Sequence, residues 1–304
     1  MLSYLVFRVI DTIEDSTINI KTKKYLFEGF LKVLEQDSYN NSLIEKCKQE
    51  LLKKLTYSYE SILLENLDVV VRLYHKIPKN ERLALLKQAK DMSNGMYKFQ
   101  KRSIKTFEDQ DEYAYYVAGV VGYIFNDLFY YNHIINKKQK EHLMEYAKQY
   151  GLGLQKVNII RDIANDIPGK RYYWPERLLQ KYKLNYQTIC LQKNREKALA
   201  ALNDMIIDAI SYLNNGLYYT MSLPRTALKV RVFCLIPLFM AIESLISCVN
   251  NENVFIKGKN VKISRNIVNN IVKKSYLCGC SNMLLRRWYE NRMKKAKVKY
   301  HKPN

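Results

Sequence analysis

Two acidic clusters, far apart in the chain, each carry a pair of aspartates four residues apart. They are Asp11-Thr-Ile-Glu14-Asp15 and Asp162-Ile-Ala-Asn165-Asp166. On an α-helix this spacing places both carboxylates on one face, one turn apart. Like charges in that position repel each other, but a divalent cation between them turns them into ligands. Because Mg²⁺ prefers oxygen ligands and also binds substrate phosphates, the clusters predict two helices that face each other across a Mg²⁺–diphosphate site.

Basic residues flank both clusters. Arg8 lies three residues before Asp11 and therefore shares its helix face, while Arg161, Lys170 and Arg171 surround the second cluster. A guanidinium grips phosphate through two parallel hydrogen bonds, so these arginines are candidate diphosphate ligands. Two plainer interpretations stay open. Either cluster alone is typical of a solvated acidic face, and each arginine is equally suited to an ion pair with its neighbouring acid.

The composition indicates an all-α protein. The chain has 304 residues, 48% of them hydrophobic, but only 10 Gly and 6 Pro, which is few for a turn-rich β fold. It contains no solenoid repeat or Pro/Gly/Ser linker, so one helical domain is the simplest prediction. Apolar periodicity predicts helices over 23–35, 58–74, 81–99, 111–131, 141–166, 193–215 and 228–249.

Two of these segments carry further information. Gly119 and Gly122 interrupt the apolar 111–131 helix, which predicts close helix packing or substrate against the backbone. The 228–249 segment contains Pro237 and Glu243, so it predicts a buried core helix rather than a membrane span. No later run reaches the ~20 apolar residues of a span, and we expect no transmembrane anchor in this chain. The six cysteines include no CxxC, which favours buried thiols in a reducing compartment.

The formal charge is +21, and a third of it lies in residues 275–304, where eight Lys/Arg face one acid, Glu290. This basic tail predicts attraction to polyanions. Its interleaved Leu284, Leu285, Trp288 and Tyr289 suit a helix lying on an anionic membrane, with a solvated tail as the alternative. We expect a cytoplasmic monomer that contacts the cytosolic face of a membrane such as the endoplasmic reticulum. No nucleic-acid-binding motif is present, so nucleic acid is not an expected partner.

Longer strings around these residues resemble a known family. They are Tyr4-Leu-Val-Phe-Arg8-Val-Ile-Asp11, Tyr113-Ala-Tyr-Tyr116-Val-Ala-Gly119, Gly151-Leu-Gly-Leu-Gln155-Lys-Val-Asn158-Ile-Ile-Arg161-Asp162, Lys170-Arg171-Tyr-Tyr-Trp174-Pro175 and Val232-Phe-Cys-Leu-Ile-Pro237. In this order, up to about Lys274, they resemble the squalene/phytoene synthase family of head-to-head prenyltransferases. The Asp-Thr-Ile-Glu-Asp form and the Tyr-Trp-Pro ending resemble its squalene branch.

The resemblance implies a single-domain isoprenoid-synthase helical fold over 1–274, with a central cavity lined by the two aspartate-rich motifs, followed by the basic tail 275–304. It implies that two farnesyl diphosphates are joined through presqualene diphosphate and reduced to squalene by NADPH. The implied Mg²⁺ ligands are Asp11, Glu14, Asp15, Asp162 and Asp166. The implied catalytic residues are Tyr116, Arg8 and Arg161, with Tyr116 assisting proton loss. No GxGxxG is present, so no Rossmann site is expected. The resemblance implies that NADPH is held by Asn158, Arg161, Lys262 and Arg265.

Two departures from the family pattern keep other functions open. Asn165 stands where the family has an acid, and the Ser-Arg-Ser-Phe phosphate hook that precedes the first motif in relatives is not in the printed sequence. We expect the chain as printed to be less active than one that carries the hook. The alternatives are a phytoene- or dehydrosqualene-type synthase that stops before reduction, and a catalytically impaired protein of this fold. A tyrosine that merely packs a core helix is the plain interpretation of Tyr116.

Overall fold

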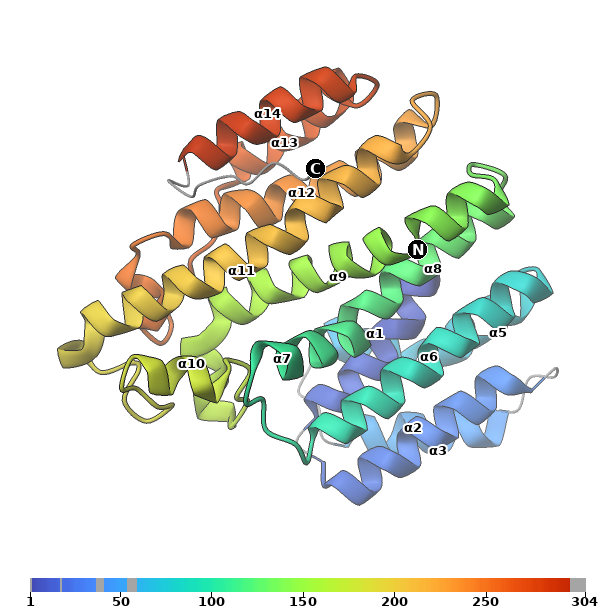
Figure 1. Cartoon of the computed structure of the whole chain (residues 1–304). Coiled ribbons are helices and arrows are strands. Elements are labelled where there is room, and N and C mark those ends of the chain that lie inside the picture. The colour runs from blue at the N-terminus through green and yellow to red at the C-terminus, as the bar shows by residue number, and fades with distance from the viewer. Residues whose placement is uncertain (1, 17, 37–40, 54–58, 296–304) are drawn as a thin grey trace. The chain divides into compact units, whose positions relative to one another are not determined.

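The chain is described here by a computed structural model that covers residues 2–16, 18–36, 41–53 and 59–295 (Figure 1). Every regular element in those residues is a helix, which confirms the all-α prediction. Contacts between Cα atoms divide the chain into two compact units, with the boundary between Arg102 and Ser103. Each unit is described by itself, and the predicted division at residue 274 stays a prediction.

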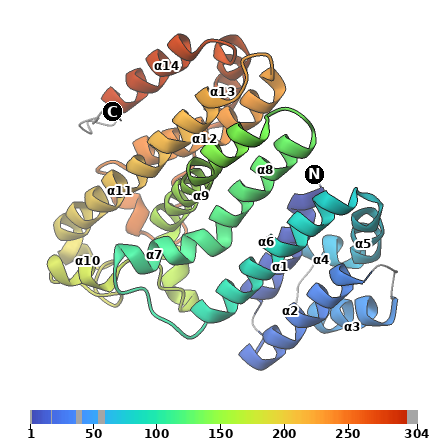
Figure 2. The same ribbon diagram turned by 45° about the vertical axis from the view of Figure 1, so that its right-hand side comes forward.

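The first unit contains six helices in the described residues. They are α1 (Leu2–Asp15), α2 (Ile20–Glu35), α3 (Asn41–Leu52), α4 (Tyr59–Glu65), α5 (Leu67–Lys76) and α6 (Lys79–Phe99). Helix α1 packs against α2, α4, α5 and α6 and therefore forms the centre of this unit (Figure 2). Apolar side chains at helical spacing, such as Val6, Ile10 and Ile13, are completely buried in these contacts. Their burial is what holds the acidic stripe of α1 in place.

The sequence pattern over 58–74 predicted one helix, but the structure has two there, α4 and α5. The break falls at Asn66, whose side-chain amide donates to the carbonyl of Ile62 at 2.8 Å. An asparagine that satisfies an orphan carbonyl in this way ends a helix, because its side chain competes with the backbone for hydrogen bonds. Ser58, the first residue of the predicted segment, lies outside the described residues.

The second unit is organised around one long helix, α9 (Lys137–Asp166), which packs against α7, α8, α11 and α12 (Figure 1). A capping box between Asn136 and Gln139 starts α9 four residues earlier than predicted. The other helical elements here are α7 (Phe107–Ala114), η1 (Tyr115–Gly119), α8 (Val120–Tyr131), η2 (Ile167–Gly169), α10 (Glu176–Lys181), η3 (Gln192–Asn194), α11 (Arg195–Ser222), α12 (Leu228–Cys248), η4 (Glu252–Phe255), α13 (Arg265–Cys278) and α14 (Asn282–Lys295).

The helices η1 and α8 approach α9 backbone to backbone. A Cβ atom built on Gly122 would lie 2.1 Å from the carbonyl oxygen of Ala147, and one built on Gly151 would lie 2.4 Å from that of Ala118. Neither helix can accommodate a side chain at these positions. The prediction of close helix packing is confirmed for Gly122. It also holds for Gly119, where an added Cβ would be 2.8 Å from a methyl carbon of Leu152.

Helix α12 is the only helix in the described residues that is long and apolar enough to cross a membrane, and 61% of its most apolar window is buried. Burial of Val232, Leu235 and Leu238 confirms the prediction of a core helix. Arg231 is completely buried and donates to the carbonyl of Leu223 at 2.7 Å. The arginine thereby satisfies a carbonyl at the end of α11, which explains how a cation is accommodated in this core.

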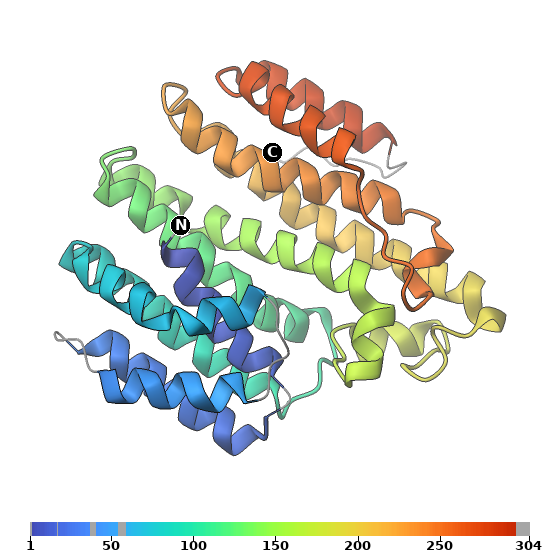
Figure 3. The ribbon, with the colours of Figure 1, turned by 180° about the vertical axis from the view of Figure 1, so that it is seen from behind.

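The predicted basic tail is folded as far as residue 295. Helix α14 packs on α12 and α13 (Figure 3). The rings of Trp288 and Phe239 stack with their centroids 3.4 Å apart, and Leu285 and Tyr289 are completely buried. The prediction that Leu285, Trp288 and Tyr289 face a membrane is therefore wrong, because the core of this unit already buries them. Three of the tail's lysines, Lys297, Lys299 and Lys302, lie outside the described residues.

The cysteines separate into two groups. Cys47, Cys234 and Cys248 are buried, and burial raises the pKa of the Cys47 thiol to about 11 and those of the other two to about 12. These thiols therefore stay protonated and unreactive at neutral pH, as expected of structural cysteines. Cys190 and Cys278 are half-buried and Cys280 is exposed, so the prediction of buried thiols is wrong for Cys280.

The glycine contact leads to a stability prediction. We expect Gly122→Ala to lower the free energy of unfolding by about 1–3 kcal/mol, the usual cost of overpacking. The melting temperature should fall by roughly 2–4 °C for each kcal/mol. Gly169→Ala is the matched control, because a Cβ atom built on Gly169 would lie no closer than 3.8 Å to its nearest neighbour, Nε of Arg171. Equal melting temperatures for the two variants, measured by circular dichroism, would contradict the close packing of α8 and α9.

Candidate active site

The first acidic motif lies at the C-terminal end of α1, on the side of that helix that is not packed into the core. Asp15 is exposed, and Arg8 and Asp11 are half-buried. The intervening residues Val9, Ile10 and Ile13 are buried in the first unit, which fixes the rotation of α1 about its axis. The predicted one-turn spacing of Asp11 and Asp15 on one helix is therefore confirmed.

Arg8 and Asp11 form an ion pair on this face, with side chains 33% and 31% exposed. The neutral pair explains how a carboxylate is held close to Asp15 without strong repulsion. Glu14 differs from the two aspartates because it is only 9% exposed. Its backbone carbonyl accepts a hydrogen bond from the buried Lys23 ammonium. Within the first unit, Glu14 therefore belongs to the buried side of α1, whereas Asp11 and Asp15 belong to the accessible side.

The second acidic motif occupies the last turn and a half of α9. Arg161 holds Asp162 in a fork, with Nε donating to Oδ1 at 2.9 Å and Nη2 to Oδ2 at 2.7 Å. This hydrogen bond is the main reason that the pKa of Arg161 is raised. Adjacent residues on a helix do not usually face each other, so the fork shows that the arginine side chain turns back along the helix surface. The guanidinium is thus already adapted to bidentate oxygen ligands.

Asp166 closes the motif at the point where α9 ends. Pro168 and Gly169 form the short helix η2, and Lys170 then adopts a left-handed conformation with φ of 57°. The chain turns back so that Arg171 Nε donates to Asp166 Oδ1 at 3.1 Å. Each of the three aspartates Asp11, Asp162 and Asp166 thus has an arginine partner in its own unit. The ion-pair interpretation of the arginines is confirmed for the protein without ligands.

Asn165, the departure from the family pattern, has a structural partner. Its amide nitrogen donates to Asn260 Oδ1 at 2.8 Å, and its amide oxygen accepts from the backbone of Gly258 at 3.4 Å. Both ends of the amide are therefore engaged with the 256–264 segment. An aspartate could not donate the first of these bonds, so the asparagine suits loop attachment better than metal binding.

The predicted NADPH residues fall in two places. Asn158 and Arg161 lie on α9, where Asn158 is exposed. Lys262 and Arg265 are exposed on the segment that Asn165 ties to α9, with Arg265 opening α13 after the Ser264 cap. Asn260, which is bonded to Asn165 in the second motif, lies two residues before Lys262. The chain around Lys262 is therefore held near that motif. The binding roles of all four residues stay predictions.

Tyr116 lies in η1, a π-helical segment that joins α7 to α8. The segment is π-helical because the Val120 amide donates to the Tyr115 carbonyl, five residues earlier. Such single π turns insert one extra residue into a helix and frequently occur at functional sites. The Tyr116 ring is half-buried and meets Tyr115 edge to face, with ring centroids 5.1 Å apart. Tyr116 is thus set apart from the regular core positions of α7 and α8, which weakens its interpretation as a plain packing residue.

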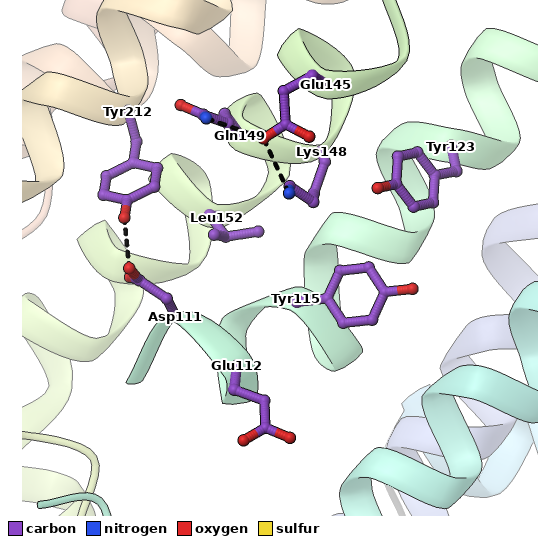
Figure 4. Close-up of a pocket in the computed structure, with 9 residues that line it drawn as sticks. All are labelled: Asp111, Glu112, Tyr115, Tyr123, Glu145, Lys148, Gln149, Leu152 and Tyr212. Atoms are coloured by element: carbon purple, nitrogen blue, oxygen red, sulfur yellow. Dashed lines mark hydrogen bonds and ion pairs between the residues drawn. The ribbon is translucent and has the colours of Figure 1, made fainter. Parts of the chain in front are cut away.

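A pocket of about 460 Å³ opens beside η1, between α7, α9 and α11 (Figure 4). Asp111 and Tyr212 close one end of it, and the Tyr212 hydroxyl donates to Asp111. Behind them lies a fully buried lysine, Lys156, which the sequence analysis did not single out. The sequence did contain a signal for this lysine, because it lies among the apolar residues Leu152, Val157 and Ile160 of a core helix.

The donor set of each motif fits Mg²⁺ and a diphosphate. Carboxylate oxygens from Asp11, Asp15, Asp162 and Asp166 are the hard ligands that Mg²⁺ takes, and the paired arginines can exchange a carboxylate for a phosphate. No group of three or more His, Cys, Asp or Glu in the described residues is arranged to hold a metal by itself. The two motifs lie in different units, and the cage formed from both stays a prediction.

Comparison with known proteins identifies the family of this chain. A profile of the squalene/phytoene synthase family matches residues 1–266. The squalene synthase of Schizosaccharomyces pombe is 32% identical over 275 residues, covering 87% of this chain and 56% of the yeast protein. That of Dictyostelium discoideum is 34% identical over 256 residues, covering 83% and 58%. The chain therefore belongs to the squalene/phytoene synthase family, and it spans less than two thirds of the length of these relatives.

Solved structures agree with the fold. A complex of the enzyme called TcSQS with a ligand superposes with a TM-score of 0.84 at 28% sequence identity. The match covers 100% of this chain and 84% of that one. A second TcSQS complex gives a TM-score of 0.80 at 27% identity. The helical architecture of this chain is therefore the one found in that protein.

The exposure of the second motif leads to a prediction. We expect Asp162→Ala to leave the free energy of unfolding within about 1 kcal/mol of wild type, because a partly exposed ion pair contributes little. The same variant should lose Mg²⁺-dependent binding of a non-reacting thiodiphosphate analogue of farnesyl diphosphate in calorimetry. Asp204→Ala is the control, because it removes an α11 aspartate whose partner, Lys181 at the end of α10, lies 2.7 Å away. Unchanged analogue binding by Asp162→Ala would rule out this residue as a ligand.

Proposed function

We propose that this chain is a Mg²⁺-dependent squalene synthase that joins two farnesyl diphosphates head to head and reduces the product to squalene with NADPH. The observation that carries the proposal is the set of intact outer aspartates, each acidic motif lying on an accessible helix face beside arginines. Identities of 30–34% to squalene synthases from a yeast, an amoeba and a plant support the squalene branch over its relatives.

Substrate binding would exchange partners at both motifs. The aspartates would hold Mg²⁺, which supplies charge neutralisation for the departing diphosphate. Arg8 and Arg161, released from their carboxylates, would then turn their fixed forks to phosphate oxygens. Such an exchange requires no new charge to be buried, because each guanidinium is already half-exposed beside its acid. The ion pairs of the ligand-free protein thus keep the arginines close to where they are needed.

Tyr116 would act on the carbon skeleton rather than on the diphosphate. As the phenolate, its oxygen would accept the proton that is lost as the cyclopropane ring of presqualene diphosphate closes, which returns the side chain to its hydroxyl form. A free tyrosine has a pKa near ~10, so this role needs a cationic or metal-rich neighbourhood. The ring itself would remain as an aromatic face, which attracts a carbocation by ~0.5–2 kcal/mol.

NADPH would supply the hydride of the second half-reaction. Asn158 and Arg161 on α9 would bind it together with Lys262 and Arg265, and the Asn165–Asn260 contact would hold the loop that carries Lys262. Two basic side chains and an amide suit phosphate and carboxamide groups without a nucleotide-binding sheet.

Product analysis tests the proposal. We expect farnesyl diphosphate and Mg²⁺ alone to give presqualene diphosphate, and addition of NADPH to give squalene. A hydrocarbon product that forms equally without NADPH would identify the phytoene- or dehydrosqualene-type alternative. Absence of any product under all conditions, with analogue binding intact, would identify the impaired protein.

Tyr116→Phe is expected to bind the thiodiphosphate analogue as wild type does but to form presqualene diphosphate on the order of 10²–10⁴-fold more slowly, the usual contribution of a general base. The ring and its packing are retained, so only the hydroxyl is lost. Tyr115→Phe, its neighbour in η1, is the matched control and should keep most of the activity. A wild-type rate for Tyr116→Phe in single-turnover analysis would show that this hydroxyl has no chemical role.

We also propose that this monomer contacts an anionic membrane, such as the cytosolic face of the endoplasmic reticulum, through the end of the chain. The supporting side chains differ from those expected from sequence. Tyr276, Leu277 and Met283 are 54%, 78% and 76% exposed around the α13–α14 turn, beside the exposed Arg286 and Arg287. A surface that combines apolar and basic side chains suits a lipid headgroup region.

The membrane contact predicts salt-sensitive co-sedimentation with vesicles that contain phosphatidylserine. Leu277→Glu combined with Met283→Glu should reduce the bound fraction severalfold, because both changes add negative charge and remove apolar contact. Leu191→Glu with Ile207→Glu, at other exposed apolar positions of the second unit, is the control. Equal binding by the two double variants would exclude the α13–α14 turn as the contact.

A further inference from the structure

Lys156 is a fully buried lysine at the centre of a three-helix junction in the second unit. Its ammonium lies 2.5 Å from Asp111 Oδ1 on α7, 2.6 Å from Asp208 Oδ2 on α11 and 3.1 Å from Gln110 Oε1. The ammonium donates hydrogen bonds to Gln110 and Asp208 and forms an ion pair with Asp111. The side chain is 0% exposed, so no water replaces a partner that moves away. Lys156 thus joins α7, α9 and α11 at one point.

An aromatic ring and two carboxylates complete the surroundings of this lysine. The Tyr212 ring lies below the ammonium, with its centroid 4.7 Å away, and its hydroxyl donates to the other oxygen of Asp111. Burial raises the pKa of Asp208, and the Lys156 charge opposes that rise. Two carboxylates share one cation, so each depends on Lys156 for its charge balance. A junction of this kind is stable only with all its members in place.

The junction is connected to Tyr116 through a short, continuous piece of helix. Asp111 lies on α7, and its backbone carbonyl accepts the amide hydrogen of Tyr115. Tyr116 follows five residues after Asp111, in the π-helical segment. A π turn that reverts to an α turn changes the register by one residue, which rotates one flanking helix against the other by ~100°. The Lys156–Asp111 ion pair attaches the α7 end of this segment to α9.

The other end of the π segment is held by the glycine contact. Gly122 on α8 lies against Ala147 of α9, with no space for a side chain between them. Both anchors of the Tyr116 segment are therefore on α9, the helix that carries Asp162 six residues after Lys156. Six residues of α-helix span about 9 Å along the axis. The α9 backbone therefore fixes the position of the Tyr116 segment relative to the second motif.

The junction also reaches the chain that follows the second motif. Gln110, which accepts from Lys156, donates through its amide nitrogen to the Tyr173 carbonyl at 2.7 Å. The neighbouring Trp174 is buried and donates to the Ile159 carbonyl at 3.1 Å. The segment that leads away from Asp166 and Arg171 is therefore attached to the same lysine through one intermediate residue. The Tyr116 segment and the chain that follows Asp166 are thus both connected to Lys156.

We propose that Lys156 is a positioning residue, a buried clamp that holds the Tyr116-bearing π segment in register with the aspartates of α9. The activity readout of this proposal rests on the proposed function. Lys156 touches neither substrate nor Tyr116 in this scheme, and it acts only through Asp111 and α7. Loss of the clamp leaves both aspartates on α9 and frees Tyr116 to leave its catalytic position.

A double-mutant cycle with Tyr116 tests the clamp. Asp111→Asn keeps the Lys156–Asp208 pair and so is the variant of choice, with Lys156→Met as the stronger perturbation. We expect each to lower kcat for presqualene diphosphate formation on the order of 10–100-fold, as small misplacement of a reacting group does. KM for farnesyl diphosphate should change little. In the Tyr116→Phe background the same substitutions should cause almost no further loss, because the hydroxyl that they misplace is already gone.

A lysine that only stabilises the fold would behave differently. It would lower kcat by the same factor with and without the Tyr116 hydroxyl, and that outcome would overturn the proposal. Lys181→Met is the matched control, because Lys181 also has an α11 aspartate partner, Asp204, at 2.7 Å but has a side chain that is 62% exposed. Its activity should equal that of wild type. If Lys156→Met does not fold, the Asp111→Asn cycle decides the question alone.

Hydrogen exchange separates this proposal from the proposed function. We expect the amides of residues 115–120 to exchange faster in Asp111→Asn than in wild type, while those of α12 keep their protection. If the wild-type protein makes no product, the proposed function fails, and the exchange result still decides whether the clamp exists. Unchanged exchange over 115–120 in Asp111→Asn would overturn it regardless of activity.

Discussion

The close approach of α8 and η1 to α9 is the contact on which the second unit depends. Gly122 and Gly151 allow the two backbones to meet, and the carbonyls of Ala147 and Ala118 occupy the space that side chains would otherwise need. A contact of this kind tolerates neither rotation nor sliding, because both surfaces are backbone. The position of Tyr116, the direction of α9 and the placement of the second acidic motif all follow from it.

Charge in this protein is arranged in local pairs despite the large positive excess. Asp11, Asp162 and Asp166 each have an arginine partner in their own unit, and the buried Lys156 balances two half-buried carboxylates. At the candidate site both members of each pair are at least partly exposed and can exchange partners, whereas at the lysine junction the cation itself is completely buried. The same kind of interaction thus serves ligand exchange where water reaches it and rigidity where water is excluded.

Asn165 and the basic end of the chain have separate physical explanations. Asn165 lacks the charge of the usual acid but attaches the 256–264 segment to α9 with both ends of its amide. The basic end of the chain, which suggested a membrane helix, contributes Leu285, Trp288 and Tyr289 to the core of the second unit. Sequence analysis missed this because an amphipathic basic helix has the same pattern whether its apolar side meets lipid or another helix.

Sequence by itself determined the helical class, the two acidic helix faces and the core nature of α12, because each depends on local spacing and on apolar content. It also identified Gly122 as a point of close approach. Only the tertiary structure decided which arginine pairs with which aspartate, since Arg161 reaches Asp162 by folding back along the helix and Arg171 reaches Asp166 through the left-handed turn at Lys170. It alone joined Lys156 to Asp111 and Asp208, which are 45 and 52 residues away in the chain. Such pairs leave no periodic trace, because burial and long-range packing create them.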